Sequence, residues 1–147
     1  MIAVVQRVSS ASVTVDSRIV GEINLGLLVL AAVHREDTDA DAQWMASKLL
    51  GLRVFPNGEK SFDLDVAQAG GSLLVVSNFT VAAETKTGRR PSLSPAAGPE
   101  HGRVVFDSLL EHLRRSPIKI EPGEFGGDMR VAITNEGPAT FILNSRE

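Results

Sequence analysis

One candidate for chemistry is the polar segment Ser77–Thr80, which follows the wholly apolar run Leu73–Val76 without a break. A run of this kind predicts a strand that is buried on both faces. The hydroxyls and amides of Ser77–Thr80 should therefore emerge at the end of that strand, where active sites on open sheets commonly lie. An ordinary turn that ends the strand would also explain these residue types.

A second candidate is the segment Asn135–Thr140, with the sequence Asn-Glu-Gly-Pro-Ala-Thr. Its composition is typical of a hairpin turn, here between the strand-like runs Arg130–Ile133 and Thr140–Leu143. A turn alone does not explain why a proline should start the returning strand, because proline lacks an N–H donor and can disturb strand pairing. We therefore expect a role for Asn135–Thr140 beyond turning the chain.

Familiar catalytic and metal-binding patterns are missing from the sequence. His34, His101 and His112 show no metal-ligand spacing, and we expect His112 on the exposed face of a helix. Asp63 and Asp65 are best explained as turn-forming or exposed carboxylates. There is no cysteine, no P-loop, no Gly-x-Gly-x-x-Gly before a helix and no Gly-x-Ser-x-Gly elbow. We expect neither a metal nor a cofactor.

The elements around these segments should form a single domain over residues 1–147, because no linker, repeat or low-complexity tract divides the chain. A chain of this length buries a core that needs no metal or disulfide. Strands are predicted by the apolar or alternating runs Ile2–Val8, Ala11–Val15, Leu27–Val33, Leu73–Val76 and several stretches between Ile118 and Ser145.

Two amphipathic helices should accompany the sheet. The first is expected to begin with Thr38 as its N-cap and to end near Gly51. The second should occupy about Glu100–Arg115, with Phe106 and Leu109 in its buried stripe. The fold class is therefore α/β or α+β, a sheet-rich domain with two main helices.

The charge of the chain limits its partners. Its net charge is −3, whereas proteins that hold long nucleic acids by counterion release are usually basic. Contact with RNA should be short and local, for which Lys86–Arg90 is the candidate patch, although a solvated loop would have the same composition. The apolar run Leu27–Val33 is too short to cross a bilayer. Met1–Arg7 lacks a signal-peptide pattern, so we expect a cytoplasmic protein without a membrane partner.

Taken together, the motifs resemble those of the bacterial D-aminoacyl-tRNA deacylases, of the D-tyrosyl-tRNA deacylase type, over essentially the whole chain. Ser77–Val81 resembles the first signature of that family, usually SQFTL, and Asn135–Thr140 matches the second, NxGPxT. Further matches to the opening strand, to an RPSF element and to a GxFGxxM stretch lie at Val4–Val8, Arg90–Ser92 and Gly123–Met129. One match could arise by chance, but their order and spacing together are specific.

The resemblance implies a barrel-like sheet, a homodimer and hydrolysis of the ester that joins a D-amino acid to the terminal adenosine of tRNA. Glycine is achiral, so glycyl-tRNA mischarged on tRNA-Ala would also be a substrate. In the family a cis Gly-Pro peptide enters the partner subunit's pocket and excludes L-amino acids. Here this peptide is Gly137-Pro138, supported by Arg7, and the sequence does not decide its isomer. DNA is not expected as a partner.

The resemblance also assigns roles within the site. The main-chain amides of Phe79 and Thr80 would stabilise the oxyanion of a tetrahedral intermediate, and the 2′-hydroxyl of the terminal ribose would help to activate or orient water. An aromatic ring and a thioether would line the pocket for the terminal adenosine. The substrate-binding residues would be Ser77, Asn78, Asn135, Phe125 and Met129.

The chain departs from the family pattern where Asn78 replaces Gln, Leu93 replaces Phe and Ala139 replaces Val. Asn78 shortens its amide by one methylene, so any contact it makes must shift or pass through water. Three other functions stay open: a non-catalytic RNA- or DNA-binding relative, an esterase with Thr80 as nucleophile, and a relaxed deacylase with a trans Gly137-Pro138 peptide. No base lies near Thr80 in the sequence to activate its hydroxyl.

Overall fold

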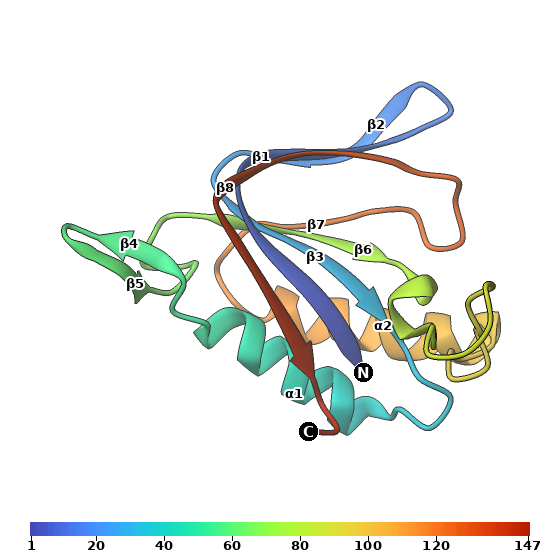
Figure 1. Ribbon diagram of the computed structural model, residues 1–147. Helices are drawn as coiled ribbons and strands as arrows, with labels where there is room; N and C mark the ends of the chain where they lie inside the picture. Colours follow the sequence, from blue (N-terminus) through green and yellow to red (C-terminus); the bar gives the residue numbers. More distant parts are fainter.

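The computed structural model describes residues 1–147 and is built around one long strand, β1 (Ile2–Val15) (Figure 1). A tight turn, in which Asp16 and Ser17 both have positive φ, joins β1 to β2 (Arg18–Ile23). After a bend the chain continues as β3 (Gly26–Ala32). β2 and β3 pair antiparallel with different halves of β1. The runs Ile2–Val8 and Ala11–Val15, which were predicted as separate strands, are the two halves of this one continuous strand.

The rest of the main sheet is mixed. β3 pairs in parallel with β6 (Ser72–Ser77), which pairs in parallel with the short β7 (Ile120–Pro122). β8 (Arg130–Asn144) pairs antiparallel with nearly the whole length of β1. A Cβ on Gly21 of β2 would lie 2.7 Å from the carbonyl oxygen of Pro122 in β7, and this close approach nearly closes the sheet into a barrel. The predicted fold class is confirmed.

Two helices pack against one face of this sheet (Figure 1). α1 (Asp39–Gly51) has Thr38 as its N-cap, and the amide of Thr38 donates to the Asp41 carboxylate at 2.9 Å in the predicted cap. α2 (Pro99–Arg114) starts one residue earlier than expected, because proline suits the first turn. Neither helix has the length and the apolar composition needed to cross a membrane.

The prediction for His112 is wrong, because its side chain lies between the two helices and is only 10% exposed. Its Nε2 is 2.9 Å from a carboxylate oxygen of Asp39 at the start of α1. A sequence pattern on one helix does not show where a second helix will cover it, which is why the neighbouring charges of α2 suggested an exposed position.

Two smaller elements complete the fold. β4 (Phe55–Asn57) and β5 (Lys60–Leu64) form a separate two-stranded hairpin, which projects beyond the end of α1 in Figure 1. η1 (Phe79–Ala82) is a single 3-10 turn directly after β6. Asp63 of the hairpin accepts hydrogen bonds from Arg53 and Asn57, and is largely covered, whereas Asp65 caps a turn as predicted.

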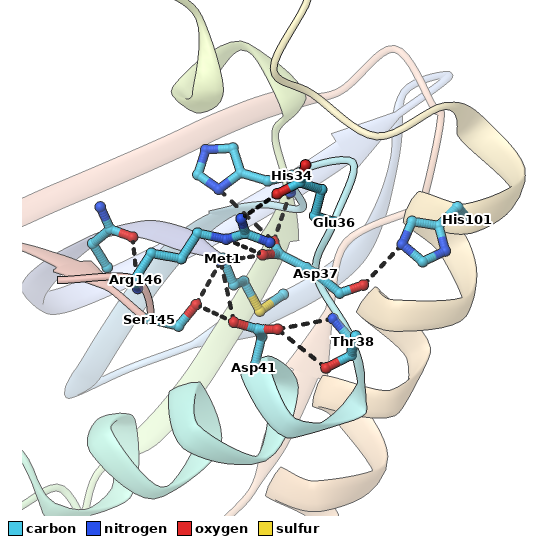
Figure 2. A network of polar contacts seen from close by, with 10 residues as sticks. Met1, His34, Glu36, Asp37, Thr38, Asp41, His101, Ser145 and Arg146 are labelled. Carbon is cyan, nitrogen blue, oxygen red and sulfur yellow. Dashed lines mark hydrogen bonds and ion pairs between the residues drawn. The ribbon is translucent and has the colours of Figure 1, made fainter.

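A buried polar network ties the start of β1 and the end of β8 to the start of α1 (Figure 2). Asp37 is 1% exposed, and one oxygen of its carboxylate lies 2.7 Å from the amine of Met1 and 3.0 Å from Nε of Arg146. The Ser145 hydroxyl accepts a hydrogen bond from the Met1 amine and donates one to Asp41. Burial of an unpaired carboxylate would be strongly unfavourable, so these cations are what stabilise Asp37 in the core.

Candidate functional site

A large cavity lies at the carboxyl end of β6, where the first predicted segment leaves the sheet. Its volume is about 820 Å³, within the range of small-molecule binding sites. Its walls come from the ends of β3 and β6, the amino end of α2 and the loop between β7 and β8. Most of the lining is apolar. The predicted site residues that line it are Ser77, Asn78, Phe79, Phe125 and Met129.

Two main-chain donors of the first segment are free. The amide of Asn78 donates to the carbonyl of Ala31 at 2.8 Å, which anchors the segment to β3. The amides of Phe79 and Thr80, which follow it, donate no hydrogen bond within the chain. Phe79 lines the cavity and Thr80 follows it, and unpaired main-chain N–H groups are the kind of donor that an oxyanion requires.

The side chain of Thr80 is engaged with its neighbour. Its hydroxyl lies 2.5 Å from Oδ1 of Asn78 and donates to that oxygen. An amide oxygen is not a base, so this contact orients the hydroxyl of Thr80 without activating it as a nucleophile. It also leaves Nδ2 of Asn78 available as a donor beside the cavity.

Phe125 forms an aromatic wall of the cavity and is held on two sides. Its ring packs against Phe106 of α2 with 5.7 Å between the centroids, and the guanidinium of Arg103 lies 4.7 Å from the ring centre. Arg103 also donates to the Phe125 carbonyl at 3.4 Å. No sequence pattern pointed to Arg103, because an arginine on an exposed helix face looks like any solvated charge.

Met129 approaches the main chain closely on another wall. A Cβ on Gly123 would lie 2.9 Å from the Met129 sulfur, so a larger residue at this position would require the Met129 side chain to shift. The aromatic ring of Phe125 and the thioether of Met129 thus face one cavity, and both are suited to contact with a nucleobase.

The second predicted segment is not a hairpin turn, and that prediction is wrong. Asn135 and Thr140 both pair with β1, so a single residue of β1, Arg7, faces residues 136–139 of β8. The segment is therefore a wide bulge within one long strand pair. Sequence alone did not show this, because β1, the partner of β8 on both sides of the bulge, lies more than 100 residues away.

Asn135 braces this bulge from within. Its Nδ2 donates to the Thr140 hydroxyl at 3.0 Å, and its Oδ1 accepts from the amide of Ala139 at 3.1 Å. Between these contacts the Gly137-Pro138 peptide is cis, and Gly137 has a φ of +127°. Gly137 and Pro138 are both exposed, so the tip of the bulge projects from the sheet.

Arg7 holds the bulge from the β1 side. Its Nε donates to the Glu136 carbonyl at 3.1 Å, directly before the Gly-Pro peptide, and its Nη1 donates to the Val54 carbonyl at 2.7 Å. Arg7 and Glu136 also line a second, smaller cavity of about 380 Å³, next to the hairpin of β4 and β5.

The two predicted segments do not meet within one chain. Arg7, Asn135, Gly137 and Pro138 are not among the residues that line the large cavity. Figure 1 shows the sharp bend of β8 at the opposite end of the sheet from the carboxyl end of β6. The chain therefore has a cavity with free donors at one place and a projecting Gly-Pro bulge at another.

Lys86, Arg89 and Arg90 are exposed and make no ion pair, in the loop that leads from η1 toward α2. No three His, Asp or Glu side chains lie close enough together to hold a metal ion.

Comparison with known proteins identifies the family to which this nearly closed barrel belongs. The model of the family described as D-Tyr-tRNA(Tyr) deacylase matches residues 4–144. The chain belongs to this family, whose members are hydrolases, and the predicted resemblance and enzyme class are confirmed.

Individual relatives agree with this assignment. The chain is 48% identical over 143 residues to the D-aminoacyl-tRNA deacylase of Methylococcus capsulatus, covering 97% of this chain and 94% of the relative. It is 45% identical over 143 residues to the D-aminoacyl-tRNA deacylase of Escherichia coli O1:K1, covering 97% and 99%.

Two solved structures share the fold over almost their whole length. A structure described as c-Myc DNA Unwinding Element Binding Protein has a TM-score of 0.92 and 37% identity, covering 98% of both chains. A probable eukaryotic D-amino acid tRNA deacylase has a TM-score of 0.80 at 17% identity, covering 97% of both chains, which is a likeness of fold.

Proposed function

We propose that this deacylase hydrolyses the ester between a D-amino acid and the 3′-terminal adenosine of tRNA, at active sites that are each shared by two copies of the chain. The separation of the two segments is the observation that carries the proposal. The Gly137-Pro138 bulge is exposed and projects from the sheet, and neither of its residues lines the cavity beside Phe79. A twofold axis would place each bulge in the other copy's cavity.

Exposed apolar side chains near the bulge support a second copy as the occupant of this face. Ile142, after the bulge on β8, is 70% exposed, and Ile133, before it, is 39% exposed. Side chains of this size on one strand are costly to leave in water and are typical of an interface.

In this arrangement the terminal adenosine lies against Phe125 and Met129, and the ester carbonyl lies near the amides of Phe79 and Thr80. Water, oriented by the ribose 2′-hydroxyl, attacks the carbonyl carbon to form a tetrahedral intermediate whose oxyanion accepts from both amides. The bond to the 3′-oxygen then breaks and that oxygen takes up a proton, which releases the free amino acid and the tRNA. The Thr80 hydroxyl takes no covalent part, since its partner is the amide oxygen of Asn78.

Chirality is sorted by main chain in this proposal. The carbonyls of Gly137 and Pro138 bind the α-amino group of the substrate and occupy the space that an L side chain would need. Arg7 and Asn135 fix their position from both sides. Glycine has no side chain to exclude, so glycyl-tRNA mischarged on tRNA-Ala is also a substrate.

The phosphates of the tRNA acceptor stem would meet the exposed cations of Lys86, Arg89 and Arg90. These lie in the segment that joins η1 to the residues around Leu93 and Pro99, both of which line the cavity. A local patch of this kind is compatible with a net charge of −3. This patch would make tRNA binding weaker at higher salt, with a shallow slope of log affinity against log salt concentration.

The direct test compares matched D- and L-aminoacyl-tRNAs and glycyl-tRNA in single-turnover hydrolysis. We expect release of D-amino acids and glycine but not of L-amino acids. Equal inertness toward all three would favour a binding protein, and similar rates on D and L substrates would favour a relaxed deacylase. Rapid hydrolysis of small activated esters without RNA would favour an esterase that uses Thr80.

The shared site is tested by dilution. Light scattering gives the fraction of dimer at each concentration, and the activity per chain is measured over the same range. Activity should fall in step with the dimer fraction. Full activity from a monomer would contradict the shared site.

DNA binding is a second candidate, favoured by the description of one structural relative as a DNA-element binding protein. The net charge of −3 argues against it, because binding to duplex DNA depends on neutralising phosphates. Fluorescence anisotropy with a labelled duplex at physiological salt should detect no binding, and saturable binding would support the second candidate.

A further inference from the structure

The guanidinium of Arg7 is fixed by two different parts of the molecule. One part is the bulge, through the Glu136 carbonyl at 3.1 Å. The other is the hairpin of β4 and β5 together with the residue before it, through the carbonyls of Val54 at 2.7 Å and Ser61 at 3.5 Å. The position of the bulge therefore depends on a hairpin that does not belong to the main sheet.

Phe62 of β5 completes this arrangement. The guanidinium carbon of Arg7 lies 5.7 Å from the centre of the Phe62 ring, within the range of a cation–π contact. The same ring meets Phe141 of β8 edge-on, with 5.8 Å between the centroids and 83° between the planes. Phe62 is nevertheless 57% exposed, so burial in the core does not explain its place.

The two contacts of Phe62 lie on opposite sides of the bulge. Arg7 is bonded to Glu136, which precedes the Gly-Pro peptide, and Phe141 follows that peptide by three residues. Phe62 thus contacts one flank of the bulge directly, at Phe141, and is linked to the other flank through Arg7. An isolated two-stranded hairpin is only marginally stable, so the Phe62 ring also fastens the hairpin to the strands that it supports.

We propose that Phe62 is a positioning residue for the Gly137-Pro138 bulge and thereby sets how strictly L substrates are rejected. The inference rests on the proposed function, in which the carbonyls of this bulge occupy the space of an L side chain. A filter made of main chain works only while it is held to within a fraction of an ångström. Without the ring, the Arg7 side chain gains freedom on one face, and the Glu136 carbonyl loses a fixed partner.

The test uses three variants at position 62 and one control. Phe62→Ala removes the ring, Phe62→Leu keeps apolar volume without an aromatic face, and Phe62→Tyr keeps the ring. The control is Ile19→Ala, which removes an equally exposed apolar side chain (61%) from β2, away from Arg7. Each protein is assayed as kcat/KM on matched D- and L-aminoacyl-tRNA, and its thermal midpoint is measured.

We expect the ratio of D to L hydrolysis to fall about fivefold in Phe62→Ala and Phe62→Leu, the scale of losing an exposed cation–π contact and an aromatic pair. The fall should come mainly from faster L hydrolysis. Phe62→Tyr and Ile19→Ala should keep the parent ratio. An unchanged ratio in Phe62→Ala, or an equal loss on both substrates, would overturn the proposal.

Failure of this inference and failure of the proposed function give different results. A parent protein that does not distinguish D from L substrates contradicts the proposed function itself. A selective parent with an equally selective Phe62→Ala contradicts only the role of Phe62. The oligomeric state of the parent protein is measured by light scattering at the protein concentrations used in the assays. A ratio that recovers at higher protein concentration would assign Phe62 to the contact between copies and would also overturn its positioning role.

Discussion

Replacing Gly137 with alanine tests whether the Gly-Pro bulge depends on main-chain geometry that only glycine provides. The φ of Gly137 is +127°, a region that L residues rarely adopt, and holding a residue there costs about 1–3 kcal/mol. The new Cβ would lie 2.8 Å from Nη2 of Arg7 and 3.1 Å from the amide nitrogen of Ala139. The guanidinium must therefore move away from its place beside the Glu136 carbonyl.

The matched control is Gly70→Ala. Gly70 also has a positive φ, +70°, but an added Cβ there would meet nothing within 4 Å. Both variants should be less stable than the parent, since a left-handed conformation costs an alanine about 1–2 kcal/mol. For a domain of this size, 1–3 kcal/mol corresponds to a fall of about 2–12 °C in the thermal midpoint.

The two variants should differ in selectivity. Single-turnover hydrolysis of D- and L-aminoacyl-tRNA is measured for both, with thermal unfolding followed by circular dichroism. Gly137→Ala should lower the ratio of D to L hydrolysis, because the displaced Arg7 no longer holds the bulge, whereas Gly70→Ala should keep it. If Gly137→Ala matched Gly70→Ala in both stability and selectivity, the argument from main-chain geometry would be refuted.

Three further predictions concern separate parts of the molecule. Thr80→Ala should keep its single-turnover rate within about tenfold of the parent, because the main-chain donors survive; a folded variant that binds tRNA but is inert would make the hydroxyl the nucleophile. Asp37→Ala should lower the free energy of unfolding in urea by about 3–5 kcal/mol, since it leaves the buried amine of Met1 without the carboxylate that lies 2.7 Å from it. The control, Asp107→Ala at an exposed position, should change the free energy of unfolding by less than about 0.5 kcal/mol. Burial lowers the pKa of His34 below its ordinary value of 6.5, so the unfolded chain binds the proton more tightly and stability should fall as the pH drops through 6.5. His34→Gln should flatten the curve of the free energy of unfolding against pH between pH 7 and 5. An unchanged slope would mean that another group causes the pH dependence.

Local patterns in the sequence determined the elements that position the site. The apolar run Leu73–Val76 predicted a buried strand, and β6 extends one residue beyond it at each end. Thr38 and Gly51 marked the limits of α1 correctly. These features were predictable because the cap of a helix and the burial pattern of a strand depend on residues a few positions apart. The roles of Phe125 and Met129 came from resemblance to a family, not from any local pattern.

Only the tertiary structure decided how the functional groups are arranged. It showed that Asn135–Thr140 is a bulge opposite Arg7 rather than a hairpin turn, and that this bulge lies away from the cavity beside Phe79. It also placed Phe62 against Arg7, a contact for which the sequence carries no signal. Such contacts join residues that are tens to more than a hundred positions apart. They depend on how whole strands pair and pack, and the order of residues along one strand does not specify its distant partner.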